Sequence, residues 1–550
     1  MYPDKKNITL LLSLILILSV DVFSQVPEFL SDSVKYVWPT NAGRSLSSTF
    51  AETRSAHFHA GIDIKTWGQE GYKVFATRDG VIHRIGISPT GYGKVVYMKH
   101  ADGSYSVYAH LNRFEPALQA YADSVRLARD AYIINDYIEH LDYRFKAGQV
   151  IAYTGATGIG PPHLHFELRT PDYEPFNPLL TNLSVDDTIP PVFAGLAVEE
   201  YSVEDGNLLD LKTYRPRRRN NLFDFGTIQI NNPAGLAVDV YDKKNNTLNA
   251  YAVYELALVV NTDTLFHSKA DYFDYLNTSQ MFIDRSYPLL FEKRKGFQRL
   301  FVVNGNELPF YRKHTDRGIL YLDEGIHNVK IIAKDYYGNT SEASVRIKSD
   351  YQKSATKLKG IKAYPYPPKN KKLIDFSFAE RIVEPQFFAL ASNRAGFEPY
   401  ETNTPGTLYL STNRSHTLIP GKHYIIHTPD QTAWVDIPAD ALFDTLDISV
   451  DHKIVHGFPE ISFYPSDIPL KNDISLKIVK PHKTENEVNQ MGIFFKNSQR
   501  RRLDYTGSRN GGNLISTSIN RLGKFVVRSD SLPPEIGRRY VRKILGGQPA

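Results

Sequence analysis

The first third of the chain alternates short runs of apolar and polar residues with glycine turns. Strands of four to eight residues with this pattern are typical of sheets that bury one face. We therefore expect β-strands at five places, which are residues 73–76, 80–87, 94–99, 104–111 and 149–153. Together these runs predict a β-rich fold from about residue 39 to residue 180.

A hairpin is expected between the third and the fourth of these strands. Asp102 and Gly103 both tolerate the positive φ of a tight primed turn, so they predict a two-residue turn. If the strand that follows is regular, Ser106, Tyr108 and His110 share one face, because alternate residues of a strand point the same way.

One segment of this region breaks the alternation. From Pro116 to about Leu141 the apolar residues recur at near-helical spacing, so we expect a helical insertion over about residues 115–143. The insertion follows the strand that carries His110. It either walls a substrate groove beside that residue or only protects the edge of a sheet.

The composition changes after Pro190 and Pro191, where longer alternating segments with Asn, Asp and Gly turns begin. We expect residues 188–350 to form an immunoglobulin-like β-sandwich that ends in a hairpin of residues 325–335 and 343–348. Residues 25–185 are then one domain that precedes it.

The last two hundred residues continue the β pattern. Residues 351–370 are rich in Lys, Tyr and Pro and suit a linker. Residues 371–550 contain further alternating runs, and they predict one or two additional β-rich domains.

The beginning of the chain has the features of an export signal. Lys5 and Lys6 precede an apolar run of thirteen residues, from Ile8 to Val20, which is shorter than the ~20 residues that a membrane span needs. We expect residues 1–24 to be a cleaved signal peptide, with an uncleaved anchor as the alternative. The mature chain, with no later membrane span, is then expected in the periplasm or outside the cell.

The amino-acid composition limits which reactive groups and metal ligands the chain can use. None of the 550 residues is cysteine, which excludes disulfides, thiolate metal sites, cysteine nucleophiles and a lipid anchor on cysteine. A metal site would have to use His and carboxylate ligands. The 65 Lys and Arg residues exceed the 60 Asp and Glu residues by only +5, so the charge does not indicate a nucleic-acid partner.

Candidate metal chemistry lies in two motifs, HFHAGID at residues 57–63 and HLHFE at residues 163–167. On an extended strand His59 and Asp63 would be about 13 Å apart, so the chain must bend near Gly61 for both to bind one ion.

The second motif needs no such bend. His163 and His165 share one face of a strand, so one can bind a metal while the other addresses the substrate. Glu167 lies on that face too and is placed to orient a histidine.

Seven motifs occur in an order that resembles the M23 (LytM/lysostaphin-type) metallopeptidases, which cut peptide cross-links of bacterial cell walls. They are HxxxD at 59–63, GYGKVV at 91–96, HADG at 100–103, YAHL at 108–111, KAGQVI at 146–151, TGATG at 154–158 and HLHFE at 163–167. The resemblance covers roughly residues 40–175. It implies an antiparallel LytM-type fold that is followed here by the β-sandwich domains.

The resemblance also implies a site. It assigns one Zn²⁺ per chain to His59, Asp63 and His165, and it makes His110 and His163 catalytic. Three protein ligands leave a fourth position open, as catalytic zinc sites do. His163 would be the general base and His110 would bind the oxyanion or the water, although spacing leaves an exchange of these roles open.

Nine other histidines are not expected to act in the site. They are His57, His83, His100 and His140 and five in the C-terminal third, which are His416, His423, His427, His452 and His456. Packing, turns or surface positions account for them.

The expected function is therefore that of an exported zinc metalloendopeptidase that hydrolyses peptide stems or cross-bridges of peptidoglycan. The rival interpretations are a catalytically silent adaptor that regulates other wall hydrolases, an exported peptidase that acts on proteins, and an adhesin. The C-terminal β domains are the candidate surface for an envelope protein partner or for binding the wall.

Overall fold

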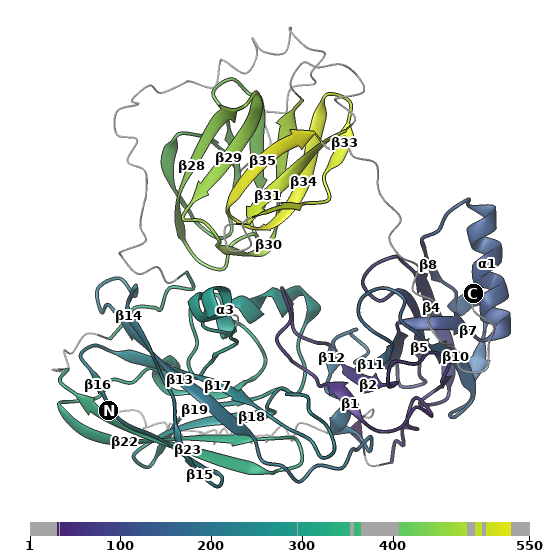
Figure 1. The fold of residues 1–550 in the computed structure, drawn as a ribbon, viewed down its shortest axis with the longest axis horizontal. Helices are drawn as coiled ribbons and strands as arrows, with labels where there is room; N and C mark the ends of the chain where they lie inside the picture. Colours follow the sequence, from purple (N-terminus) through teal and green to yellow (C-terminus); the bar gives the residue numbers. More distant parts are fainter. Residues whose placement is uncertain are drawn as a thin grey trace, which may run out of the picture.

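The computed structural model describes residues 30–31, 33–293, 295–351, 357–364, 406–480, 490–497 and 502–529. Figure 1 shows that strands dominate, which confirms the mainly β fold class. The expected signal peptide of residues 1–24 and much of the expected linker lie outside the described residues. No helix among the described residues is both long enough and apolar enough to cross a membrane.

The N-terminal region, residues 36–185, contains a nine-stranded and a three-stranded sheet. The main order of the larger sheet is β1-β2-β11-β6-β5-β4-β8, with β12 beside β11 and β9 beside β4, and the smaller sheet is β3-β10-β7. The strands are β1 (Leu46–Ser48), β2 (Ile62–Lys65), β3 (Lys73–Phe75), β4 (Gly80–Ile87), β5 (Lys94–Lys99), β6 (Tyr105–Ala109), β7 (Leu111–Phe114), β8 (Ile134–Tyr137), β9 (Arg144–Phe145), β10 (Val150–Thr154), β11 (His163–Arg169) and β12 (Pro175–Phe176).

The predicted strands are found, with one correction. Strands β4 and β5 have the expected ends, β3 ends one residue earlier than expected, and β10 begins and ends one residue later than expected. The run 104–111 is not one strand. It ends at Ala109 in the large sheet and resumes at Leu111 in the small one, because His110 between them has a positive φ of 58°.

The hairpin at Asp102 and Gly103 exists, but its turn is longer than predicted. The His100 amide donates to the Ser104 carbonyl over 2.9 Å, so three residues rather than two make the turn. Gly103 alone has a positive φ, and the Asp102 carboxylate accepts the Ser104 amide at 3.0 Å. A three-residue loop with glycine in the left-handed region suits a hairpin equally well.

The insertion is helical only in its first half. Helix α1 (Pro116–Ala128) begins at Glu115, whose carboxylate accepts the Ala117 amide at 3.0 Å, and it buries Leu118. The expectation of a helix as far as residue 141 is wrong, because β8 follows and pairs with β4 at the edge of the large sheet. A short 3-10 helix, η2 (Glu139–Leu141), completes the insertion. Another 3-10 helix, η3 (Pro178–Leu180), follows β12.

The middle region, residues 192–349, has a four-stranded sheet, β14-β13-β17-β20, and a seven-stranded sheet, β15-β16-β23-β22-β18-β19-β21. The predicted hairpin is β22 and β23, which pair antiparallel. The elements of the middle region are β13 (Val192–Tyr201), β14 (Leu208–Tyr214), β15 (Arg217–Arg219), β16 (Leu222–Ile230), β17 (Ala234–Tyr241), β18 (Glu255–Val260), β19 (Asp263–Lys269), η4 (Tyr275–Gln280), α2 (Met281–Asp284), α3 (Tyr287–Lys293), β20 (Gln298–Arg299), β21 (Tyr311–His314), η5 (Thr315–Gly318), β22 (Gly325–Lys334) and β23 (Thr340–Ser349).

The C-terminal region, residues 406–529, has two six-stranded sheets, β24-β26-β27-β30-β34-β33 and β25-β28-β29-β35-β31-β32. Its strands are β24 (Thr407–Ser411), β25 (Arg414–Leu418), β26 (His423–His427), β27 (Ala433–Ile437), β28 (Leu446–Val455), β29 (Phe458–Tyr464), β30 (Pro469–Val479), β31 (Met491–Asn497), β32 (Arg502–Tyr505), β33 (Arg509–Gly511), β34 (Leu514–Arg521) and β35 (Lys524–Ser529).

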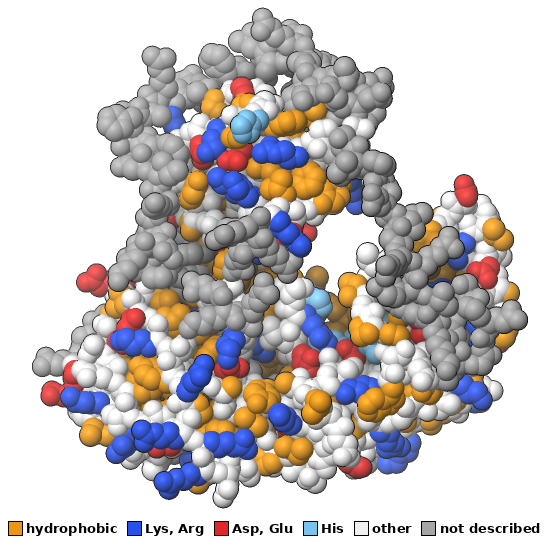
Figure 2. All heavy atoms as spheres, in the orientation of Figure 1, with side chains coloured by type: hydrophobic (Ala, Val, Ile, Leu, Met, Phe, Trp, Pro, Cys, Tyr) orange, Lys and Arg blue, Asp and Glu red, His pale blue; other side chains and the backbone are white. Residues whose placement is uncertain are grey.

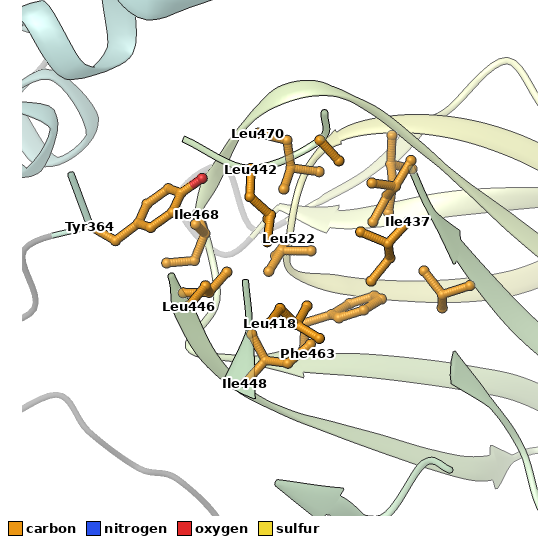
Figure 3. Close-up of a cluster of buried hydrophobic side chains, with 14 of the residues drawn as sticks. Tyr364, Leu418, Ile437, Leu442, Leu446, Ile448, Phe463, Ile468, Leu470 and Leu522 are labelled. Atoms are coloured by element: carbon orange, nitrogen blue, oxygen red, sulfur yellow. The ribbon is translucent and has the colours of Figure 1, made fainter. Parts of the chain in front are cut away.

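The core between these two sheets extends beyond them. Figure 3 shows Leu418, Ile448 and Phe463 among its apolar side chains, with Tyr364 at one end. The Tyr364 hydroxyl accepts the Phe443 amide at 2.9 Å. Buried residues of the middle region, such as Phe301, belong to the same cluster, so the C-terminal region packs against the middle region through apolar contacts.

Candidate metal centre and active site

Three side chains meet on one face of the large sheet. His165 of β11 is paired with Asp63 of β2 on one side and with Ala109 of β6 on the other. Residues directly opposite each other on neighbouring strands project from the same face. His59 precedes β2 and joins them from the loop, and all three side chains are buried.

The predicted bend between His59 and Asp63 is present. The His59 amide and carbonyl pair with Glu52 and Ala51 instead of with the sheet. Gly61 makes the turn into β2 against β11, where a Cβ atom would lie 2.1 Å from the Phe166 carbonyl oxygen. Only glycine fits there, so the HFHAGID spacing depends on Gly61 for steric reasons.

The ligand atoms form a small triangle. Nε2 of His59 lies 3.0 Å from Oδ1 of Asp63 and 3.0 Å from Nδ1 of His165, and the latter two atoms are 2.8 Å apart. Because the sides are this short, one point can lie about 2.0 Å from all three atoms, which is the bond length of zinc to nitrogen or carboxylate oxygen. The two nitrogens and one oxygen therefore fit a zinc ion.

The outer nitrogens of these histidines are held by acceptors. Nδ1 of His59 donates to the Thr49 carbonyl over 2.7 Å, and Nε2 of His165 donates to the Glu167 carboxylate over 2.8 Å. A carbonyl or carboxylate can only accept, so the hydrogen sits on the outer nitrogen. The inner nitrogens then turn their lone pairs toward Asp63, as metal ligands require.

The electrostatics favour a positive charge at this point. Burial opposes the charged form of His165, but its hydrogen bonds to Asp63 and Glu167 outweigh burial and raise its pKa to about 9. Burial likewise opposes the charge of Asp63, yet His59 and His165 hold its pKa well below the usual range. A proton and a metal cation therefore compete for the position between these three side chains.

His110 reaches the site by a route that its strand position does not predict. In a regular strand it would share a face with Ser106 and Tyr108, opposite to the face of Ala109 and His165. The positive φ of His110 reverses this, and its ring centroid lies 5.8 Å from that of His165. A non-glycine residue in this backbone conformation is uncommon, and such strain is typical of functional sites.

His163 completes the group of four histidines. Its ring centroid lies 4.5 Å from that of His110, and its Nε2 lies 3.7 Å from Oδ1 of Asp63. The Nδ1 atoms of His110 and His163 donate to the carbonyls of Thr157 and Pro161, over 2.9 and 2.7 Å. Both rings therefore leave Nε2 free of a hydrogen and directed inward when they are neutral.

Burial keeps these two rings neutral. It lowers the pKa of His110 to about 4, with the nearby His163 and His165 acting in the same direction. Burial also lowers the pKa of His163, although Asp63 opposes this. Each ring is consequently a hydrogen-bond acceptor at neutral pH and is ready to take a proton.

Two polar side chains near the site were not singled out by the sequence analysis. Arg54 donates from Nη2 to Oδ2 of Asp63 over 3.1 Å, which leaves Oδ1 for the metal. Tyr92 donates its hydroxyl hydrogen to Glu167. Tyr92 belongs to the GYGKVV motif, but Arg54 has no recognisable local signal.

The other histidines of the N-terminal region lie outside this group. His57 is exposed, and the described candidate metal ligands do not include it. His83 pairs with Glu139 at 2.7 Å, and His100 is buried between the Asp79 carbonyl and the Ser106 hydroxyl. These contacts are consistent with the packing and turn roles expected of them.

A second cluster of carboxylates has a different character. Asp187, Asp242 and Asp335 approach one another where the N-terminal and middle regions join. The Lys244 ammonium lies 2.8 Å from Asp187 and 3.6 Å from Asp242. Because this buried ammonium already compensates part of the negative charge, we assign the cluster a structural role.

A family comparison matches part of this region. Residues 57–126 match the model of peptidase family M23. The matched segment includes His59, Asp63 and His110, and the second His-x-His pair follows it in the chain.

Individual proteins match over a similar length. The chain is 32% identical over 132 residues to the murein hydrolase activator NlpD of Escherichia coli, which is 24% of this chain and 27% of that protein. It is 33% identical over 122 residues to the DD-carboxypeptidase/endopeptidase Mpg of Neisseria meningitidis, which is 22% of each. The chain thus spans less than a third of the length of these relatives.

Solved structures were matched as well. A zinc-containing peptidase from Vibrio cholerae is 23% identical, with a TM-score of 0.21, and the match covers 28% of this chain and 40% of that one. The family match and the curated relatives identify a peptidase family M23 domain in the N-terminal region of the chain.

Proposed function

We propose that this protein is a zinc metalloendopeptidase that hydrolyses peptide cross-links of peptidoglycan. The observation that carries the proposal is the orientation of the four histidines. Each has its outer nitrogen held by an acceptor, and the inner nitrogens of His59, His163 and His165 lie within 3.7 Å of Oδ1 of Asp63. A catalytically silent protein has no need to keep all of them aligned.

His59, Asp63 and His165 would hold the ion, one per chain. Zinc bound there supplies a Lewis acid that polarises a substrate carbonyl and makes a water molecule more acidic. Arg54 keeps the second oxygen of Asp63 occupied, and Glu167 keeps the ring of His165 in the required tautomer. The donor set of two imidazoles and a carboxylate also suits zinc better than calcium or magnesium.

His163 takes the proton of the attacking water at Nε2 and passes it to the leaving amine. Its side chain is 13% exposed, so it is open to an incoming peptide. Neutral His110 accepts a hydrogen bond from the same water at Nε2 and so helps to orient it. His110 cannot serve as an oxyanion donor in this state, since its one ring hydrogen is bonded to Thr157.

The exposure of His163 suits a polymeric substrate, because its side chain is open to solvent while the candidate ligands are buried. Figure 2 shows a hollow between the N-terminal and C-terminal regions, with pale blue histidine side chains beside it. A peptide that belongs to a large network needs such an open approach. β8 pairs with β4 and is separated from β6 by β5 and β4, so this part of the insertion covers the edge of the large sheet away from His165.

The proposed setting is the cell envelope. The curated relatives include the outer membrane antigenic lipoprotein B of Haemophilus influenzae, which is 30% identical over 151 residues. We propose that residues 1–24 direct export to the periplasm or the exterior and that no lipid anchor follows. Residues 188–350 and 371–550 would then be separate β domains that bind the wall or an envelope partner.

The test is digestion of purified cross-linked peptidoglycan by the mature chain, with mass spectrometry of the soluble fragments. New peptide ends that disappear with a zinc chelator support the enzyme and identify the bond. Intact cross-links in the presence of one bound zinc per chain would refute the proposed substrate.

A second candidate function is activation of another wall hydrolase without catalysis. It is favoured by the relative that is named a murein hydrolase activator. In this case the chain releases nothing from peptidoglycan by itself, but it accelerates a separate murein hydrolase added to the same digest. Retained acceleration by the His163→Ala variant would support this function over the first one.

A further inference from the structure

A tyrosine of the middle region lies in the hydrogen-bond network behind the candidate metal ligands. The Tyr275 hydroxyl donates to Oε2 of Glu167 over 2.8 Å and accepts from Nη2 of Arg169 at 2.9 Å. The other oxygen of Glu167 accepts Nε2 of His165 at 2.8 Å. A single carboxylate therefore connects Tyr275 to a candidate zinc ligand.

Glu167 is fully buried, and each of its oxygens has two partners. Oε1 accepts from His165 and from the Tyr92 hydroxyl, and Oε2 accepts from Arg169 and from Tyr275. Three of these four partners are in the N-terminal region, and Tyr275 is 108 residues farther along the chain than Glu167. The middle region thus supplies one of the four groups that fix this carboxylate.

The segment that carries Tyr275 is itself firmly placed. The Asp274 carboxylate accepts the Leu276 amide at 2.9 Å and starts η4. The Thr278 hydroxyl accepts the amide of Phe58 at 3.0 Å, directly before the ligand His59. Phe273 packs against Phe58, with ring centroids 5.7 Å apart. The segment therefore contacts the site next to two of the three candidate ligands.

We propose that Tyr275 is a positioning residue for the metal centre, so that the peptidase site is complete only when the middle region is docked against it. This inference rests on the proposed zinc function. Groups that orient a metal ligand through a second hydrogen bond commonly change metal affinity by about 10- to 100-fold. Tyr275 is one hydrogen bond farther from the metal than Glu167, so we expect its loss to change zinc affinity by about tenfold.

The decisive variant is Tyr275→Phe in the full mature chain. It removes one hydroxyl and retains the ring, which packs against Phe273 with centroids 6.0 Å apart. The zinc dissociation constant is measured by competition with a chromophoric chelator. We expect it to rise about tenfold, and we expect the visible absorption of the Co²⁺-substituted protein to change, because the field at His165 changes.

The chain offers a matched control in Tyr201→Phe. Tyr201 donates to Glu199 over 2.6 Å, and Arg299 donates to the same carboxylate at 2.8 Å. This buried group of a tyrosine, a glutamate and an arginine has the same hydrogen-bonding chemistry as Tyr275, Glu167 and Arg169. Tyr201 belongs to the core cluster that the middle and C-terminal regions share. Its removal should lower stability by a similar amount and leave zinc affinity and the Co²⁺ spectrum unchanged.

A double variant tests whether Tyr275 acts on the metal centre through Glu167. If Tyr275 acts through Glu167, then Tyr275→Phe changes zinc affinity much less in a Glu167→Gln background than in the wild type. Equal zinc affinity of Tyr275→Phe and the wild type, or an equal loss in Tyr201→Phe, would overturn the inference. Absence of zinc from the wild type would instead overturn the proposed function.

Discussion

The imidazole rings of His110 and His163 lie 4.5 Å apart, centroid to centroid, although His110 stands in the turn between two sheets and His163 begins β11. Each ring gives its Nδ1 hydrogen to a backbone carbonyl. Both Nε2 atoms are therefore fixed acceptors, and that of His163 lies 3.7 Å from Oδ1 of Asp63. Two neutral bases at one candidate metal centre are suited to moving a proton from water to a leaving amine.

The His163→Ala variant should separate catalysis from metal binding. It removes the more exposed base, so we expect peptidoglycan hydrolysis to fall about 10²- to 10⁴-fold while zinc stays at one per chain. Fragment release and metal content are measured on the same preparation. His57→Ala is the control, because His57 is exposed and lies outside the ligand group. Normal hydrolysis by a folded His163→Ala protein would falsify the assignment.

The Asp63→Ala variant should lose the metal. Asp63 is the one carboxylate of the ligand triangle, and Oδ1 touches both ligand histidines. Zinc at 100 times its dissociation constant should stabilise the wild type by about 2.7 kcal/mol and raise its Tm, and a chelator should reverse this. The variant should show no zinc-dependent rise in Tm. A thermal shift equal to that of the wild type would exclude Asp63 as a ligand.

The sequence predicted the parts of this site that local rules govern. Alternation located β4 and β5 to the residue, and strand parity placed His163, His165 and Glu167 on one face. These features depend only on the period of an extended backbone. The same reasoning failed at His110, because a positive φ at a single residue leaves no trace in the hydrophobic pattern.

Long-range partners were beyond sequence reasoning for a different reason. Tyr275 meets Glu167 only because η4 folds back over the N-terminal region, and no periodicity relates residues so far apart. The helix predicted as far as residue 141 ended at Ala128 because the edge of β4 offered a pairing partner to the residues that follow. Tertiary pairing there outweighs local propensity.

The Gly61→Ala variant should disrupt the approach of β2 to β11. The added Cβ would meet the Phe166 carbonyl oxygen at 2.1 Å, a backbone atom that cannot move away alone. We expect a loss of about 2–4 kcal/mol in the free energy of unfolding, together with weaker zinc binding, because Asp63 and His165 sit on the separated strands.

Thermal unfolding and zinc competition check this prediction. Gly511→Ala is the control, since an added Cβ at Gly511 meets nothing within 4 Å. Its effect should stay within about 0.5 kcal/mol. If Gly61→Ala melts like the wild type and keeps its zinc affinity, then close packing at Gly61 does not set the ligand geometry.

The stability of the N-terminal region should fall in mild acid because of His100. Burial lowers the pKa of His100 to about 4, against about 6.5 for an unfolded histidine. Between these values the unfolded chain binds a proton that the folded chain does not, so stability decreases as the pH drops from about 6.5 toward 4. From pH 7 to pH 5 this one group should cost about 2 kcal/mol.

Calorimetry on the wild type and on His100→Gln, with a chelator present throughout, measures this contribution. His100→Gln lowers Tm at pH 7, since the ring bridges the Asp79 carbonyl and the Ser106 hydroxyl. The difference in Tm between the two proteins should then shrink by about 4–8 °C from pH 7 to pH 5, because glutamine does not titrate. The Tm of His140→Gln, a variant at an exposed position, should change with pH in the same way as the Tm of the wild type. A difference that stays constant with pH would mean that His100 takes up its proton as readily in the folded protein as in the unfolded chain, against this prediction.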